Sequence, residues 1–220
     1  MSYPQELRQI PILAGLPDEE LTALSSSLHK RQITKGSTVL HEHEPGEYMM
    51  FLLKGKVKVA LVGPDGKEVI IAMLDDGDVI GELSILTDEP RSADVVAQSD
   101  CCVYVLGKAD FNNHLSKFPG LAKSLLKSIA FRLIAASEKI GDLALFDVYR
   151  RVARVLKSLG DEIEEGGAKV YRITQRPTHQ ELAAMVGTSR EMVTRALKGL
   201  EEDGCIAVHD KAITLKRIPR

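Results

Sequence analysis

The sequence contains few cysteines, and their placement excludes several classes of protein. Three cysteines occur among 220 residues, and two of them are adjacent, at Cys101 and Cys102. This number and spacing form no disulfide framework. The absence of a cysteine cluster near the N-terminus argues against an iron–sulfur centre. Cys101 and Cys102 would point to opposite faces of a strand, so we interpret both as packing residues.

Long hydrophobic runs and a leader segment are also lacking. No apolar run approaches the ~18–20 residues of a transmembrane helix, and residues 1–16 have neither the basic start nor the cleavable apolar core of a signal peptide. No nucleophile–base pair or metal-ligand cluster is evident, so we do not expect an enzyme, a metal site or a required cofactor. His41 and His43 lie on one face of a candidate strand, but we interpret them as surface histidines. We expect a cytoplasmic protein without a membrane partner.

The composition is that of an ordinary globular protein with two small domains. Hydrophobic residues make up 44% of the chain and charged residues 27%. The net charge of −2 conceals an asymmetry, because residues 145–220 carry 14 Lys and Arg against 11 Asp and Glu, whereas the remaining residues carry 15 against 20. A C-terminal part with a net charge of +3 is only mildly basic, so charge alone is weak evidence of nucleic-acid binding.

Turn signals between short β-rich runs predict an all-β unit over residues 31–106. The runs lie at residues 49–53, 57–62, 69–74, 79–80, 93–97 and 101–106. Pro64–Gly66 and Asp75–Asp78 supply turn residues between them. Evenly spaced strands of this kind suggest a small barrel or a double-sheet jelly roll. One or two short helices are expected over residues 5–30, and another over residues 110–115.

Two short segments between predicted strands form the most informative motif, Gly81–Leu83 and Arg91–Ala93. Gly81 allows a ligand to approach the main chain, and Glu82 can accept hydrogen bonds from a sugar hydroxyl. Arg91 and Ser92 offer donors suited to a phosphate. A sugar and a singly charged phosphate in one pocket indicate a cyclic nucleotide. A β-turn with a surface Glu–Arg pair is the alternative, and the position between two strands of a barrel favours the nucleotide.

Residues 119–144 predict a long helix with heptad periodicity. Apolar residues recur in steps of four and three, at Ala122, Leu126, Ile129, Leu133, Ala136, Ile140 and Leu143. Such a seam indicates a two-helix coiled coil, and a parallel pair of identical chains would form a twofold dimer. Leu121, Leu125 and Ile134 lie off the seam and could dock the helix on the β unit. A helix packed only on its own domain is the alternative.

Residues 178–189 carry the signals of a helix-turn-helix. Thr178 and Glu181 have the spacing of a capping box at the start of one helix. Gly187 can take the left-handed conformation that ends this helix, and Ser189 can cap the next. A helix is expected before this motif, at residues 146–159, and an acidic loop follows it at residues 160–167. After the motif, two short strands at residues 206–208 and 212–215 would form a hairpin, the wing.

The second helix of this motif separates its polar and apolar residues sharply. Its exposed arc would hold Arg190, Glu191, Thr194, Arg195 and Lys198. Arg can address guanine, and Glu can accept from the cytosine amino group. Phosphate contacts would come from Thr178, Ser189 and Lys198. A solvated helix face would look the same alone, but the two caps, the glycine turn and the wing favour binding to double-stranded DNA.

Taken together, these features closely resemble those of the CRP/FNR family of bacterial transcription regulators. The resemblance covers essentially the whole chain, and its specific segments are Gly81–Leu83, Arg91–Ala93, Ser137–Ala144 and Ser189–Arg195. It implies an α+β chain with three parts. These are an N-terminal β jelly-roll cyclic-nucleotide-binding domain (residues 1–118), a long dimerisation helix (119–144) and a C-terminal winged helix-turn-helix domain (145–220).

The resemblance also implies roles for single residues. Glu82 would contact the ribose, and Arg91 with Ser92 the cyclic phosphate. Ser137 would reach the adenine from the long helix of the partner chain. The residues that match the family's base readers for a TGTGA-like half-site are Arg190, Glu191 and Arg195. The implied effector is cyclic AMP, but Ala136 stands where the family's cyclic-AMP receptor has a threonine for the adenine amino group, so cyclic GMP is an alternative.

We therefore expect a homodimeric transcription regulator that a cyclic nucleotide switches and that contacts RNA polymerase. The effector would bias two recognition helices toward a spacing of one DNA turn, about 34 Å. One alternative is the same architecture with another effector or none. Another is a regulatory subunit whose C-terminal domain binds protein, although such a domain has no need of the three base-reader side chains on one exposed arc.

Overall fold

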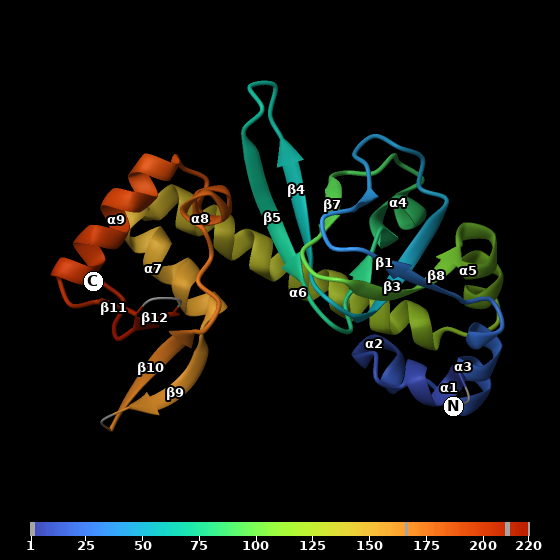
Figure 1. Ribbon diagram of the computed structural model, residues 1–220. Helices are drawn as coiled ribbons and strands as arrows, with labels where there is room; N and C mark the ends of the chain where they lie inside the picture. Colours follow the sequence, from blue (N-terminus) through green and yellow to red (C-terminus); the bar gives the residue numbers. More distant parts are fainter. Residues whose placement is uncertain (1–2, 166, 210–211, 220) are drawn as a thin grey trace. The chain divides into compact units, whose positions relative to one another are not determined.

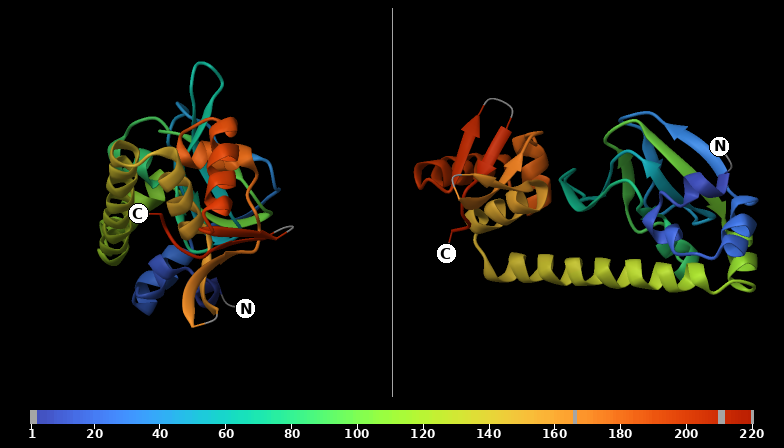
Figure 2. Two further views of the ribbon diagram at one scale, coloured as in Figure 1. Left: turned by 90° about the vertical axis from the view of Figure 1, so that its left-hand side faces the viewer. Right: turned by 90° about the horizontal axis from the view of Figure 1, so that it is seen from below.

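The computed structural model of the chain describes residues 3–165, 167–209 and 212–219. It divides into two compact units, one of residues 1–63 and 71–133, the other of residues 64–70 and 134–220. The boundary falls within a long helix, α6 (Gly120–Leu145), which Figure 2 shows as one unbroken helix. Among the described residues, no helix is long and apolar enough to cross a membrane.

Two four-stranded sheets form the centre of the first unit (Figure 1). The order of the first sheet is β1 (His29–Ile33), β8 (Cys101–Gly107), β3 (Tyr48–Lys54) and β6 (Val79–Ile80). The order of the second is β2 (Thr38–Leu40), β7 (Asp94–Ala97), β4 (Val57–Val62) and β5 (Glu68–Leu74). This arrangement confirms the predicted jelly roll and most of its strands.

The apolar run in β3 is buried on both faces of its sheet. Met50 and Leu52 pack with β7 and β8 in one hydrophobic core. Met49 and Phe51 pack in a second core with the leucines of the N-terminal helices. Successive side chains of a strand point to opposite faces, so one short segment supplies both cores. Cys101 packs in the core that contains Met50, in agreement with its predicted packing role.

Three short helices, rather than the expected one or two, precede the sheets. They are α1 (Tyr3–Leu7), α2 (Pro11–Ala14) and α3 (Asp18–Ser25). Glu20 on α3 is 3% exposed, and its carboxylate accepts a hydrogen bond of 2.8 Å from the backbone N–H of Leu121. The N-terminus of α6 is therefore held by a side chain that lies about 100 positions earlier. A Cβ on Gly120 would collide with this carboxylate, which explains the glycine.

The long helix α6 buries only part of its apolar surface. Leu121 and Leu125 are buried in the core of the first unit, as their off-seam positions predicted. Ile134 was expected to dock in the same way, but it is 56% exposed. Most of the large seam residues are also exposed within the single chain, with 69% for Leu126 and 67% for Leu133, whereas Ile129 is half-buried. The first turns of α6 are thus tied to the jelly roll, and the seam is left uncovered.

Beyond α6, the described residues of the second unit form three helices and a four-stranded sheet. The helices are α7 (Val148–Leu159), α8 (His179–Val186) and α9 (Arg190–Glu202). The sheet order is β11 (Ile206–His209), β12 (Ala212–Leu215), β10 (Ala168–Ile173) and β9 (Asp161–Glu165). One core joins α7, α8 and α9 to β12, which gives the predicted winged helix-turn-helix its fixed shape.

Two further local expectations were wrong. The acidic segment predicted as a loop contains strand β9, which pairs with β10. Cations of β10 offset its carboxylates, with Lys169 2.6 Å from Glu162 and Arg172 3.0 Å from Glu165. The strand expected to hold His41 and His43 ends before them, since β2 stops at Leu40 and His43 has a φ of 68°. Within the described part of the chain, no group of three His, Cys, Asp or Glu is suited to a metal ion.

Candidate functional site

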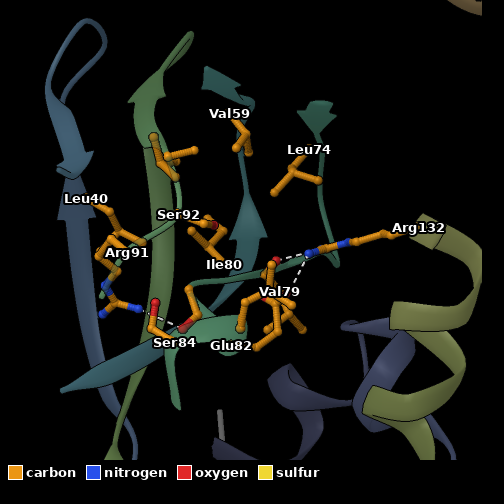
Figure 3. A pocket seen from close by; sticks show the side chains of 14 residues that line it. Leu40, Val59, Leu74, Val79, Ile80, Glu82, Ser84, Arg91, Ser92 and Arg132 are labelled. Carbon is orange, nitrogen blue, oxygen red and sulfur yellow. Dashed lines mark hydrogen bonds and ion pairs between the residues drawn. The ribbon is translucent and has the colours of Figure 1, made fainter. Parts of the chain in front are cut away.

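The two motif segments come together at an open pocket in the first unit (Figure 3). One part of its wall is apolar and comes from Leu40, Val59, Leu74, Ile80 and Val95. The polar part comes from Glu82, Arg91, Ser92 and Arg132. Arg91 and Arg132 lie at opposite sides of the pocket, with Glu82 facing Arg132. The pocket therefore offers an apolar surface between two guanidinium groups.

Gly81 stands where the chain leaves β6 and enters the short helix α4 (Glu82–Thr87), which the sequence did not predict. Its φ is 78°, a left-handed conformation that favours glycine. A Cβ here would lie 2.6 Å from Nη1 of Arg91 and 3.0 Å from a methyl carbon of Leu40. The structure thus supplies a reason for this glycine other than the approach of a ligand. The residue makes room for the arginine.

Arg91 is buried, with 3% of its surface exposed, and several neighbouring groups hold its guanidinium in place. Its Nη1 donates to the carbonyl of Gly81 (2.7 Å), and its Nη2 donates to the carbonyl of Tyr48 (2.6 Å). The guanidinium also lies 5.1 Å from the centre of the Tyr48 ring. Burial lowers the pKa of Arg91, but an arginine remains cationic at neutral pH. Two carbonyls and one ring therefore hold a fixed positive charge at the pocket wall.

Glu82 occupies the first position of α4 and is 3% exposed. Nη1 of Arg132 lies 2.7 Å from its carboxylate, and Nη2 of Arg132 donates to the carbonyl of Val79 (2.6 Å). Burial raises the pKa of Glu82, while the nearby positive charge of Arg132 opposes the rise. The carboxylate is thus held between α4 and α6, where it can accept a hydrogen bond from a hydroxyl group in the pocket.

Arg132 is a pocket residue that the sequence reasoning missed. A signal for it does exist in α6, in the stripe that runs one residue before the heptad seam. This stripe begins with the buried Leu121 and Leu125, continues through Ser128, and reaches Arg132 by the same steps of four and three. A charged residue on the stripe that docks the helix needs a partner on the jelly roll. The sequence could not say that Glu82 is this partner.

The remaining predicted nucleotide residues differ in their placement. Ser92 lines the pocket beside Arg91, and Leu83 lies at its edge with 45% of its surface exposed. Ser137 does not line the pocket, because it lies on the part of α6 that belongs to the second unit. The family resemblance implies that Ser137 would reach the nucleotide from the partner chain.

The helix-turn-helix of the second unit has the predicted caps. The Thr178 side chain accepts from the N–H of Glu181 (3.1 Å), and the Glu181 carboxylate accepts from the N–H of Thr178 (2.7 Å). Gly187 has a φ of 72°, and Ser189 accepts from the N–H of Met192. These contacts confirm the predicted capping box, glycine turn and second cap. They also occupy the side chains of Thr178 and Ser189, which were expected to contact phosphates.

Helix α9 exposes one face and buries the other. The exposed residues are Arg190, Glu191, Thr194, Arg195 and Lys198. The buried ones are Val193, Ala196, Leu197 and Leu200. Hydrogen bonds from its own backbone N–H and from the Ser189 hydroxyl lower the pKa of Glu191, which is therefore an ionised acceptor. The predicted base readers thus share one exposed helix face.

Comparisons with known proteins match both units. The cyclic nucleotide-binding domain model matches residues 30–118, and the Crp-like helix-turn-helix domain model matches residues 150–220. The cAMP-activated global transcriptional regulator Vfr of Pseudomonas aeruginosa is 34% identical over 90% of this chain and 94% of its own. A CRP-like cAMP-activated global transcriptional regulator of Mycobacterium tuberculosis is 30% identical over 95% and 93%.

The chain belongs to the CRP/FNR family. Like other members, it is a DNA-binding, cyclic-nucleotide-binding transcription regulator and not an enzyme. A solved structure of the c-di-GMP responsive global regulator CLP of Xanthomonas campestris has a TM-score of 0.79 at 21% identity. It covers 91% of this chain and 100% of its own, which supports the fold alone. In terms of the family's two domains, the pocket lies in the nucleotide-binding domain, and α8 and α9 lie in the DNA-binding domain.

Proposed function

We propose that this CRP/FNR-family chain is a homodimeric transcription regulator whose effector is cyclic AMP. The observation that carries the proposal is the pocket in which a fixed Arg91 cation and the Glu82 carboxylate face one apolar cavity. Arg91 with Ser92 would bind the cyclic phosphate, and Glu82 would accept from the ribose hydroxyl. Gly81 and Leu83 complete the site. The cAMP-activated relatives support the same effector.

The exposed seam of α6 supports the dimer. Leu126, Leu133 and Ile140 are each at least 67% exposed in the single chain. Burying a side chain of this size contributes roughly 1.5–3 kcal/mol, so pairing two copies of this seam would be strongly favourable. A parallel pair would also place Ser137 of each helix near the other chain's nucleotide. Ala136 lacks the hydroxyl that would complete the contact to adenine, and cyclic GMP is therefore the second effector candidate.

The exposed face of α9 supports recognition of double-stranded DNA. Arg190, Glu191 and Arg195 would read bases of a TGTGA-like half-site, and two copies would read a palindrome. Thr178, Ser189 and Lys198 would contact phosphates, Thr178 and Ser189 mainly through the helix N-termini that they cap. We further propose that the dimer acts in the cytoplasm and contacts RNA polymerase, for which the acidic β9–β10 hairpin is a candidate surface.

Calorimetric titration of the nucleotide-free, full-length protein tests the effector. Cyclic AMP should bind more tightly than cyclic GMP, and cyclic di-GMP serves as a third arm. A failure of cyclic AMP to bind would contradict the proposal.

DNA recognition is tested with a TGTGA palindrome and a scrambled duplex. Arg190→Ala should lose about 1–3 kcal/mol on the palindrome only. Lys198→Ala should weaken both duplexes alike and reduce the salt dependence.

A further inference from the structure

A chain of hydrogen bonds joins the two helices of the helix-turn-helix. Nη2 of Arg176 lies 3.2 Å from Nε2 of His179, and Nδ1 of His179 lies 2.8 Å from the Thr194 hydroxyl. The Thr194 hydroxyl in turn donates to the carbonyl of Arg190 (3.0 Å). The chain begins in the segment before α8 and ends in the first turn of α9. It therefore reaches the point at which the proposed base readers begin.

The contacts of His179 are all satisfied in only one protonation state. A hydroxyl has one hydrogen, and Thr194 donates it to the carbonyl of Arg190. Thr194 must then accept from His179, so the hydrogen of the imidazole is on Nδ1. Arg176 can only donate, so Nε2 of His179 must accept. Both nitrogens are satisfied only in the neutral Nδ1–H tautomer.

A second proton on His179 would break this arrangement. It would convert Nε2 from an acceptor into a donor that faces the guanidinium of Arg176. The charged groups that act on the imidazole are Arg176, from the segment before α8, and Arg190, from α9, and both are cations. Partial burial of His179, together with these two cations, lowers its pKa. The acid nearest in sequence, Glu181, is engaged in the capping box with Thr178.

We propose that His179 is a positioning residue for DNA recognition and that it acts only as a neutral imidazole. It holds Thr194, and through Thr194 the first turn of α9, in the position from which Arg190 and Glu191 address bases. Thr194 thereby belongs to the positioning device rather than to the base readers. This inference rests on the proposed reading of DNA by α9. It predicts that specific binding weakens as His179 becomes protonated.

Nitrogen NMR of the full-length protein tests the first half of this inference. The ¹⁵N shifts of the His179 imidazole should show the Nδ1–H tautomer, with a pKa below the usual value for histidine. Thr194→Val should weaken the tautomer preference, since only the donation from Arg176 to Nε2 would then maintain it, whereas Thr194→Ser should retain it in full. An Nε2–H tautomer, or a pKa at or above the usual value, would overturn the inference without reference to DNA.

DNA affinity against pH tests the second half, with saturating cyclic AMP, a TGTGA palindrome and a scrambled duplex. At pH 7.5, Thr194→Val should weaken binding to the palindrome by roughly two- to tenfold, the effect of one hydrogen bond. Thr194→Ser should restore it. Lowering the pH to one unit below the pKa that NMR measures for His179 should reduce the preference of the wild type for the palindrome by a similar factor. His179→Gln should have no such pH dependence, whereas the control His43→Gln, on an exposed turn, should keep it.

Two results would contradict this role. If binding to both duplexes strengthens on acidification and His179→Gln removes the effect, His179 contacts phosphate and does not position α9. If the wild type prefers the palindrome equally at both pH values, His179 has no role in recognition and the proposed function stands. A wild type that prefers the palindrome at neither pH would instead overturn the proposed DNA recognition, and the inference with it.

Discussion

At the residue scale, Arg91 combines two tasks in one side chain. Its guanidinium satisfies the carbonyls of Gly81 and Tyr48, and it also places a positive charge at the pocket wall. A mobile lysine ammonium would not reproduce this planar set of donors. The proposed phosphate site is therefore organised before a ligand arrives, which would reduce the entropy lost on binding.

Arg91→Leu should weaken cyclic-nucleotide binding by roughly tenfold to 150-fold, since a charge-assisted hydrogen bond contributes about 1.5–3 kcal/mol. It should also destabilise the first unit, because the two partly buried carbonyls lose their donor at a cost of at most about 1–3 kcal/mol each. Calorimetric titration measures the first effect, and urea unfolding followed by circular dichroism measures the second. Unchanged affinity in a folded variant would remove Arg91 from the binding site.

Glu82 shows the cost of keeping a carboxylate in a pocket wall. Its pKa in the folded protein is raised by burial above the value in the unfolded chain. The folded state therefore binds more protons in the range between the two values. The stabilising contribution of this group is fully present below the unfolded pKa and is lost as pH rises through the folded pKa.

Glu82→Gln should remove this part of the pH dependence and stabilise the nucleotide-free protein at neutral pH. The amide oxygen can still accept from Arg132, so the contact between α4 and α6 is kept. Nucleotide affinity should fall roughly fivefold, because a hydrogen bond to a neutral acceptor is about 1 kcal/mol weaker than one to a carboxylate. Urea unfolding between pH 4 and 8, with titration of cyclic AMP, separates the two effects. A variant that is less stable than the wild type at neutral pH would show that the ion pair with Arg132 outweighs burial.

At the element scale, α6 has two stripes with different tasks. One stripe carries Leu121, Leu125 and Arg132, which dock the helix on the jelly roll and close the pocket. The other stripe is the exposed heptad seam, which supports the proposed dimer. The two stripes are adjacent on the helix. A change in the pairing of two helices would therefore also affect the position of Arg132 at the pocket. Ala136 lies on the seam, and Ser137 directly follows it in the sequence.

Ala136→Thr tests whether this part of α6 contacts the base. A hydroxyl at this position should tighten the binding of cyclic AMP by about 0.5–1.5 kcal/mol if it donates to or accepts from adenine. A β-branched side chain on the seam should also weaken dimerisation by overpacking. Nucleotide titration and sedimentation without ligand measure the two effects separately. Tight native binding that is unchanged in an intact variant dimer would show that position 136 has no part in base recognition.

At the scale of the whole molecule, the nucleotide and DNA sites belong to different units. Control of one by the other therefore requires a coupling free energy, and such a coupling is reciprocal. If cyclic AMP strengthens binding to the palindrome by some factor, the palindrome must strengthen binding of cyclic AMP by the same factor. Coupling of this kind is typically 5- to 150-fold.

This reciprocity is testable with the full-length protein. Cyclic AMP should be titrated with and without the palindrome, and the palindrome with and without cyclic AMP. The two ratios should agree within error. In Arg91→Leu, a cyclic AMP concentration that just saturates the wild type should strengthen binding to the palindrome less than it does in the wild type. A nucleotide that binds tightly but leaves DNA affinity unchanged would show that the pocket does not control α9.

The sequence by itself determined the order and type of most elements. Strand runs, turn residues and helix caps depend on contacts within a few positions, and the capping box of Thr178 and Glu181 appears in the structure as derived. The seam of α6 was also readable, because a helix repeats its faces regularly. The family resemblance then linked these elements to two known kinds of domain, which the comparisons confirmed.

Only the tertiary structure decided which distant residues meet. Arg132 and Glu82 lie 50 positions apart, and His179 and Thr194 lie 15 apart on different helices. The acidic residues of β9 led us to predict a loop. Cations of β10 offset these charges, and a local sequence pattern does not show that the two strands pair. Such pairs depend on packing between elements, and one sequence does not specify which side chains that packing brings together. Local periodicity thus determined the elements, and long-range contacts decided the sites.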